Sequence, residues 1–191
     1  SRTQAAHQAA GGLHAPEKVL GEDEDGKAQF DNTRSEAGEA LFQLKYRSDW
    51  SQVKPIAQAL FDNIIPNLPK IDLIVPVPAS TPRARQPVDE IAQALGQLSG
   101  VPVSTTLVQA KPPSADAKPL KNLTTKEEKD AALQGRFSID VSVPVPKDAT
   151  VLVVDDLFAT GASMGAICTL LQTHPKVASV YAAAVTKTGK A

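Results

Sequence analysis

The pattern of hydrophobic and polar residues predicts helices and strands that alternate along most of the chain. Apolar residues recur at helical spacing in residues 35–47, 51–65 and 88–98 and again after Ser163, and residues 122–134 are typical of a more polar helix. Apolar or alternating runs predict strands over residues 71–77, 101–108, 137–145, 151–154 and 177–185. This order predicts an α/β domain with a mostly parallel sheet flanked by helices.

Two stretches lack this pattern. Residues 1–35 are rich in Ala, Gln and Gly and carry an acidic cluster at 22–25, so we expect an N-terminal arm that is flexible or loosely packed. Residues 111–121 are rich in Pro, Ala and Lys and predict a mobile excursion. The folded domain is therefore expected to cover residues 36–191.

Composition excludes several classes of protein. The net charge is −1, so we do not expect this domain alone to bind nucleic acid. No apolar run is long enough for a transmembrane helix, and a soluble cytoplasmic protein without a membrane partner is the expectation. The one cysteine, Cys168, excludes internal disulfides and Cys-rich zinc sites, and its place on an apolar helix face predicts a core residue.

The most informative stretch is residues 151–163. Four apolar residues predict a buried strand that ends at Asp155 and Asp156, and a short loop then leads into a helix. Free backbone N–H groups and the helix dipole favour an anion at such a loop. Carboxylates repel phosphate but accept hydrogen bonds from a diol, so the stretch predicts a cradle for a ribose 5-phosphate. The residues expected at the phosphate are Ala159, Thr160, Gly161, Ala162 and Ser163.

Other interpretations of this stretch were compared by spacing. An ATP-binding P-loop needs a Lys after its second glycine, and none follows Gly161. A dinucleotide fingerprint needs three glycines, but only Gly161 and Gly165 are present. A receiver domain would need more sheet than the residues after Asp156 provide. The plain alternative is that the two carboxylates cap the next helix and the loop is an ordinary turn.

A second polar segment follows another predicted strand. Ligands of open α/β sheets bind beyond the carboxyl ends of strands, and residues 79–86 leave such an end. Guanidinium groups suit phosphate oxygens, so this loop is a candidate pyrophosphate site. Its candidate residues are Ser80, Thr81, Arg83 and Arg85. A solvated basic loop is the alternative.

Residues 151–163 resemble the phosphoribosyl pyrophosphate (PRPP) motif of type I phosphoribosyltransferases. Four shorter segments resemble the ComF-type, or competence-family, branch: 44–47 (LKYR), 72–78 (DLIVPVP), 135–137 (GRF) and 187–189 (KTG). The resemblance covers about residues 36–191. The chain departs from the family pattern at Ala159, which replaces a threonine, and in a shorter loop at 79–86. It also departs in residues 111–136, which correspond to the flexible hood that covers the reaction centre in the family.

The resemblance implies a type I phosphoribosyltransferase fold with a flexible hood loop, PRPP as substrate and Mg²⁺ bound with it. Asp155 and Asp156 would be the catalytic pair and would hold the metal directly or through water. The implied reaction moves the 5-phosphoribosyl group to a nucleobase or amine that the sequence does not identify, with release of pyrophosphate. The departures leave a second reading open: a non-catalytic PRPP or nucleotide sensor, or an adaptor in DNA uptake or processing. A homodimer is also left open.

Overall fold

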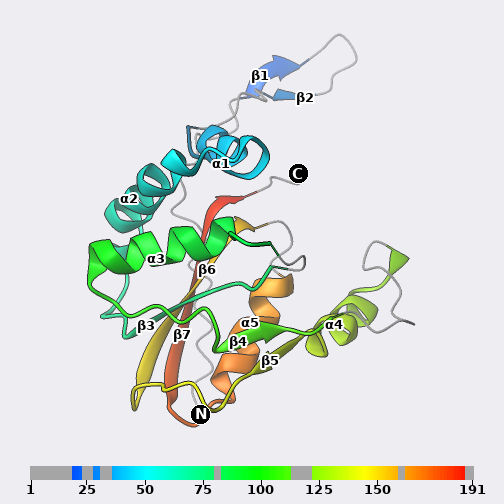
Figure 1. Cartoon of the computed structure of the whole chain (residues 1–191). Helices are drawn as coiled ribbons and strands as arrows, with labels where there is room; N and C mark the ends of the chain where they lie inside the picture. Colours follow the sequence, from blue (N-terminus) through cyan, green and yellow to red (C-terminus); the bar gives the residue numbers. More distant parts are fainter. Residues whose placement is uncertain are drawn as a thin grey trace.

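The computed structural model describes residues 19–22, 28–30, 36–79, 83–112, 122–158 and 162–187. Its centre is a three-stranded parallel sheet in the order β3 (Leu73–Pro76), β6 (Ala149–Phe158) and β7 (Val177–Lys187). Helices lie on both sides of this sheet (Figure 1). The α/β class and the parallel sheet predicted from the sequence are confirmed.

Side chains that alternate along the strands build two cores. On one face, Ile74 and Leu152 pack with α1 (Glu36–Arg47), α2 (Val53–Asn63) and α3 (Pro87–Ser99). On the other face, Val75 and Val153 pack with α5 (Ala162–Gln172). Because the sheet is covered on both faces, its strands are apolar throughout their buried part.

A smaller unit packs beside α5 and includes the region expected to form the hood. Strands β4 (Val108–Ala110) and β5 (Phe137–Ile139) pair antiparallel, and α4 (Lys126–Gln134) precedes β5. Thr125 accepts a hydrogen bond from the Glu128 N–H while the Glu128 carboxylate accepts one from the Thr125 N–H, which fixes the start of α4. Both α4 and β5 contact α5.

Several expected elements differ from the observed ones. Residues 101–108 do not form one strand: Val103 makes a single parallel bridge to Ile74, and a turn held by the Ser104 hydroxyl precedes β4. The expected strand 137–145 stops at Ile139, because the Asp140 carboxylate accepts hydrogen bonds from the backbone and hydroxyl of Ser142 and turns the chain.

The other differences are at element ends. The helix expected over 51–65 is α2, preceded by the 3₁₀ turn Trp50–Gln52 and followed by a second one, Ile65–Asn67. Strand β6 does not end at the acidic pair but continues through it to Phe158. In the region of the expected N-terminal arm, β1 (Val19–Glu22) and β2 (Ala28–Phe30) pair antiparallel. Within the described ranges, no helix is both long and apolar enough to span a membrane.

The connections place a crevice between β3 and β6. After β3 the chain passes through α3 to the Val103 bridge on one side, whereas after β6 it passes through α5 to β7 on the other side. The strand order therefore reverses between β3 and β6. In open α/β sheets, ligands bind outside the carboxyl ends of the strands at such a switch point.

Candidate functional site

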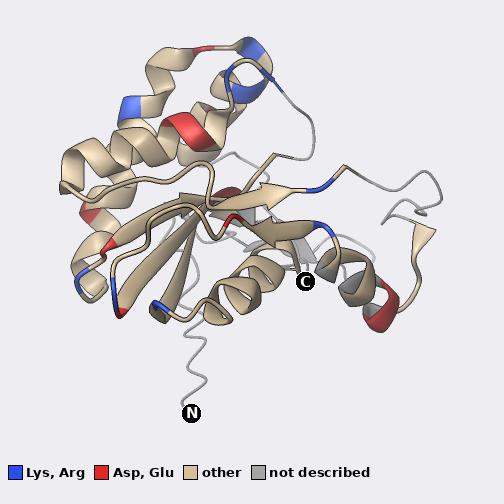
Figure 2. Ribbon diagram, turned by 60° about the horizontal axis from the view of Figure 1, so that its bottom comes forward, with Lys and Arg blue, Asp and Glu red and all other residues tan. Residues whose placement is uncertain are grey.

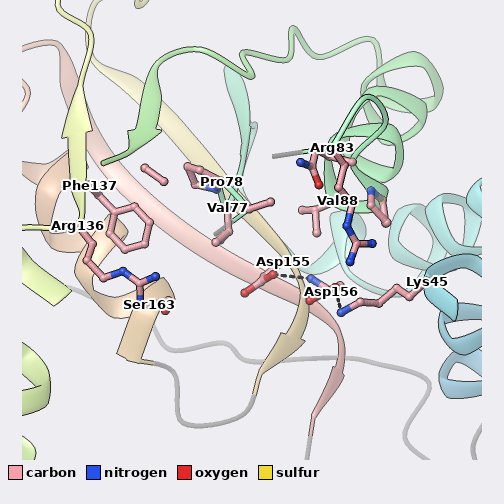
Figure 3. A pocket seen from close by; sticks show the side chains of 14 residues that line it. Lys45, Val77, Pro78, Arg83, Val88, Arg136, Phe137, Asp155, Asp156 and Ser163 are labelled. Carbon is pink, nitrogen blue, oxygen red and sulfur yellow. Dashed lines mark hydrogen bonds and ion pairs between the residues drawn. The ribbon is translucent and has the colours of Figure 1, made fainter. Parts of the chain in front are cut away.

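A cavity of about 340 Å³ lies at this switch point. Its wall includes the chain that leaves β3 (Val77, Pro78 and Ala79), the acidic pair of β6, and Ser163 at the start of α5. Three cationic side chains also line it: Lys45, Arg83 and Arg136. Figure 3 shows these side chains converging from different elements on the end of β6.

Strand geometry separates the two carboxylates. Successive side chains of a strand point to opposite faces, and Val153 faces α5 while Val154 faces α1–α3. Asp155 therefore lies on the α5 side and Asp156 on the α1 side. Two adjacent carboxylates can thus address two parts of one ligand rather than compete for the same part.

Asp156 is ion-paired with Lys45. The Lys45 Nζ lies 2.5 Å from Asp156 Oδ2, and the two side chains are 30% and 14% exposed. Lys45 is carried by α1, whose buried Leu41 and Leu44 fix the helix on the core. The ammonium group neutralises one of the two carboxylates.

No ion pair of Asp155 with another described residue is found, and the pKa of Asp155 departs from its ordinary value. Burial, and then the negative charge of Asp156, raise its pKa from 3.8 to about 7. The Asp156 N–H donates to Asp155 Oδ1 at 2.8 Å, which opposes this rise. Burial and the neighbouring charge therefore favour the protonated form of Asp155.

Two guanidinium groups complete the polar lining. Arg83 extends from the loop before α3, on the side of Lys45 and Asp156 (Figure 3). Arg136 lies at the start of β5, where its backbone oxygen accepts from the Lys111 N–H, and its side chain points toward Ser163. Elsewhere in the described chain, basic and acidic residues are interspersed (Figure 2).

The structure brings together only some of the residues predicted from the sequence. Asp155, Asp156, Arg83 and Ser163 line one cavity, and Ala162 begins α5 beside Ser163. Arg85 does not line it; its side chain is bound to Glu90 and stacks on Trp50. Five predicted residues lie outside the described ranges: Ser80, Thr81, Ala159, Thr160 and Gly161.

Sequence reasoning missed Lys45 and Arg136 as site residues. Each lies in a segment that resembles the ComF-type branch, 44–47 and 135–137. A charged residue inside each of these two short segments was the feature that could have identified Lys45 and Arg136.

The donor set fits Mg²⁺ only when a ligand shares it. In the ranges that the structure describes, no group of three or more His, Cys, Asp or Glu side chains is placed to hold a metal ion. Mg²⁺ is commonly held by one or two carboxylates together with substrate phosphates. Asp155 and Asp156 could supply such carboxylate oxygens.

The chain was compared with known proteins. No protein-family model and no curated protein matches it. Among solved structures, a hypothetical protein from Neisseria gonorrhoeae with bound ppGpp is 17% identical, with 74% of this chain and 70% of that chain covered and a TM-score of 0.48. Adenine phosphoribosyltransferase from Thermoanaerobacter pseudethanolicus is 20% identical, with 85% and 89% covered and a TM-score of 0.42.

UMP synthase from Leishmania donovani is 16% identical, with a TM-score of 0.39. The alignment covers 84% of this chain but only 25% of the UMP synthase, so the chain spans about a quarter of that protein's length. At these identities and TM-scores the likeness assigns no activity, and the function is argued from the site alone.

Proposed function

We propose that this protein binds PRPP with Mg²⁺ and transfers its 5-phosphoribosyl group to an acceptor, with release of pyrophosphate. The observation that carries the proposal is the acidic pair on β6, which lies among three cationic side chains in the cavity at the switch point. A ligand that suits this lining has a hydrogen-bond-donating centre and anionic ends. PRPP has a ribose diol between two phosphate-bearing ends.

The acidic pair suits the ribose. Carboxylate oxygens only accept hydrogen bonds, and the two ribose hydroxyls can donate them. Asp156 is ion-paired with Lys45 on one side, and its carboxylate also lines the cavity, where its oxygens can accept from a hydroxyl. Asp155 would lose its proton when a ligand binds, because the hydroxyls of a diol or a bound metal ion favour the ionised carboxylate.

The start of α5 suits the 5-phosphate. Its first N–H groups lack intrahelical acceptors, and the positive end of the helix dipole points the same way. Ala162 and Ser163 begin this helix, and Arg136 points toward it. We propose that residues 159–161 complete the phosphate loop, as their sequence predicts.

The loop after β3 suits the pyrophosphate. Arg83 lines the cavity beyond the acidic pair, and the guanidinium fork matches phosphate oxygens. Ser80 and Thr81 belong to the same loop and remain proposed ligands. Mg²⁺, when bound with PRPP, would supply further positive charge to these oxygens.

The reaction needs little covalent chemistry from the protein. Cleavage of the bond between C1 and the pyrophosphate oxygen leaves an oxocarbenium-like sugar, and negative charge develops on the leaving group. Arg83 is placed to stabilise that charge. Phe137 and Arg136 form the wall opposite Arg83 and would limit access of water to the reactive sugar.

Calorimetry with Mg²⁺ and PRPP tests the binding step. We expect saturable binding by the wild type and a loss of at least tenfold in affinity in Asp155→Asn and Asp156→Asn. Asp62→Asn is the matched control, because Asp62 is an exposed carboxylate on α2. Absence of binding at millimolar PRPP, or equal affinity in all four proteins, would contradict the proposal.

Turnover needs a separate assay. Pyrophosphate release from PRPP, screened against purines, pyrimidines and amines, would identify the acceptor. Release with no acceptor, or with water only, would argue against a transferase. Binding without any release would favour the alternative, a PRPP or nucleotide sensor.

The family branch, the cellular location and the oligomeric state are proposed from the sequence. We propose the ComF-type branch from residues 44–47, 72–78, 135–137 and 187–189, and with it a link to competence and nucleotide metabolism that transformation assays can test. A cytoplasmic location is proposed from composition. Sedimentation would decide between the monomer and the homodimer.

A further inference from the structure

Arg85 is held by two contacts outside the cavity. Its Nε donates to Glu90 Oε1 at 3.1 Å, and its guanidinium carbon lies 3.8 Å from the centre of the Trp50 ring. A planar guanidinium over an indole face is a favourable cation–π geometry. The Nε donor and one face of the Arg85 guanidinium are therefore in contact with protein groups, while the side chain remains 49% exposed.

The tryptophan that Arg85 stacks on is held in place by the fold. Trp50 packs against the core formed by α1, α2 and α3, and its backbone N–H donates to the Ser48 backbone oxygen. The Asp49 carboxylate accepts from Ser51 and Gln52, which holds the turn between α1 and α2. Arg85 thus ties the loop before α3 to a rigid corner of another part of the chain.

Arg83 is in the opposite situation two residues earlier. Its side chain is exposed and lines the cavity, and no hydrogen bond or ion pair of Arg83 with another described residue is found. On the far side of Arg85, the Gln86 oxygen accepts from the Glu90 N–H, and Pro87 begins α3. The chain that follows Arg83 is therefore anchored by the Arg85 side chain and by the first turn of α3.

We propose that Arg85 is a positioning residue that clamps the loop onto Trp50 and Glu90 so that Arg83 alone presents its guanidinium to the anionic leaving group. This assignment rests on the proposed function for the identity of that group. The two arginines look equivalent in the sequence, but in this proposal Arg83 contacts the ligand and Arg85 positions the loop.

The competing account is direct binding, in which Arg85 leaves Trp50 and contacts the pyrophosphate itself. The two accounts differ in their response to Arg85→Lys. Lysine keeps the positive charge but loses the planar group and the Nε donor that make the clamp. Direct binding predicts that most affinity is retained, whereas positioning predicts that lysine is as poor as methionine.

Titration of Mg-PRPP and of magnesium pyrophosphate into a set of variants tests this. We expect Arg85→Lys, Arg85→Met and Glu90→Gln each to weaken binding about fivefold, with the double variant Arg85→Met/Glu90→Gln no weaker than either single one. Arg83→Met should weaken binding more and reduce its salt dependence, while the Arg85 variants keep the wild-type salt dependence. Trp50→Phe, which retains an aromatic face, should stay within twofold of the wild type.

Amide hydrogen exchange of residues 83–90 without ligand makes the test independent of PRPP. We expect faster exchange in Arg85→Met and unchanged exchange in Arg83→Met. Unchanged exchange in Arg85→Met overturns the clamp even if PRPP binds, and so does full affinity in Arg85→Lys or tighter binding in Glu90→Gln. If exchange rises in Arg85→Met but the wild type binds neither probe, the proposed function fails and the loop serves another ligand.

Discussion

Asp155→Asn should make the protein more stable at alkaline pH and at the same time weaken PRPP binding at least tenfold. The carboxyl of Asp155 has a pKa raised from 3.8 to about 7 in the folded protein, first by burial and then by the charge of Asp156. Asparagine keeps the side-chain oxygen that accepts from the Asp156 N–H at 2.8 Å, removes the charge, and replaces the other oxygen by an amide NH2 of similar size.

The sign follows from proton linkage. Below pH 3.8 the carboxyl is protonated in both states and costs nothing. As pH rises to about 7, the unfolded chain releases the proton while the folded protein retains it, so stability falls across this interval and is constant above it. Three pH units correspond to about 4 kcal/mol, which is the most that the asparagine can restore.

Thermal unfolding between pH 4 and pH 8 measures this directly. For a chain of this size each kcal/mol shifts Tm by about 2–4 °C, so we expect a higher Tm for Asp155→Asn at pH 8 and no difference near pH 4. Asp62→Asn, on the exposed side of α2, is the matched control variant. A difference between wild type and Asp155→Asn that is the same at both pH values would refute the reasoning, as would an asparagine variant that is less stable throughout.

Two further predictions concern Lys45 and Gly96. Lys45→Met leaves the mostly buried carboxylate of Asp156 without its cation, and we expect a loss of about 1–3 kcal/mol at pH 7 together with weaker PRPP binding, measured by urea unfolding and calorimetry. Gly96→Ala would place a Cβ 2.4 Å from Val103 Cγ2, so we expect a loss of about 1–3 kcal/mol by urea unfolding. Gly165→Ala is its control, because a Cβ there meets nothing within 4 Å and the helix propensity of alanine predicts unchanged or higher stability.

The sequence was sufficient for the regular elements because their signals are local. Helical spacing predicted α3 to within one residue at each end. Residues 101–108 misled because their apolar positions suit a strand, whereas the fold uses only Val103 as a bridge and turns the chain at Ser104. Which apolar run pairs with which neighbour depends on contacts remote in sequence, and alternation alone cannot decide it.

The acidic residues of the site could be predicted from the sequence, but the side chains that contact them could not. The acidic pair of Asp155 and Asp156 stands out in the sequence because it follows an apolar strand. Lys45 reaches Asp156 only because α1 packs across β7, and no local pattern encodes that contact. Arg83 and Arg85 are equivalent in sequence, and the position of Trp50 distinguishes them.

The unequal lengths of β3 and β6 explain why the acidic pair is both rigid and accessible. The register between the two strands ends at Pro76 opposite Val154, and one further hydrogen bond joins the Val77 N–H to the Val154 oxygen before the chain leaves the sheet. On its other side β6 stays paired with β7 up to Phe158. Asp155 and Asp156 therefore lie past the end of β3, on a strand whose opposite edge is hydrogen-bonded to β7, so the sheet rather than a loop sets the backbone positions of both residues.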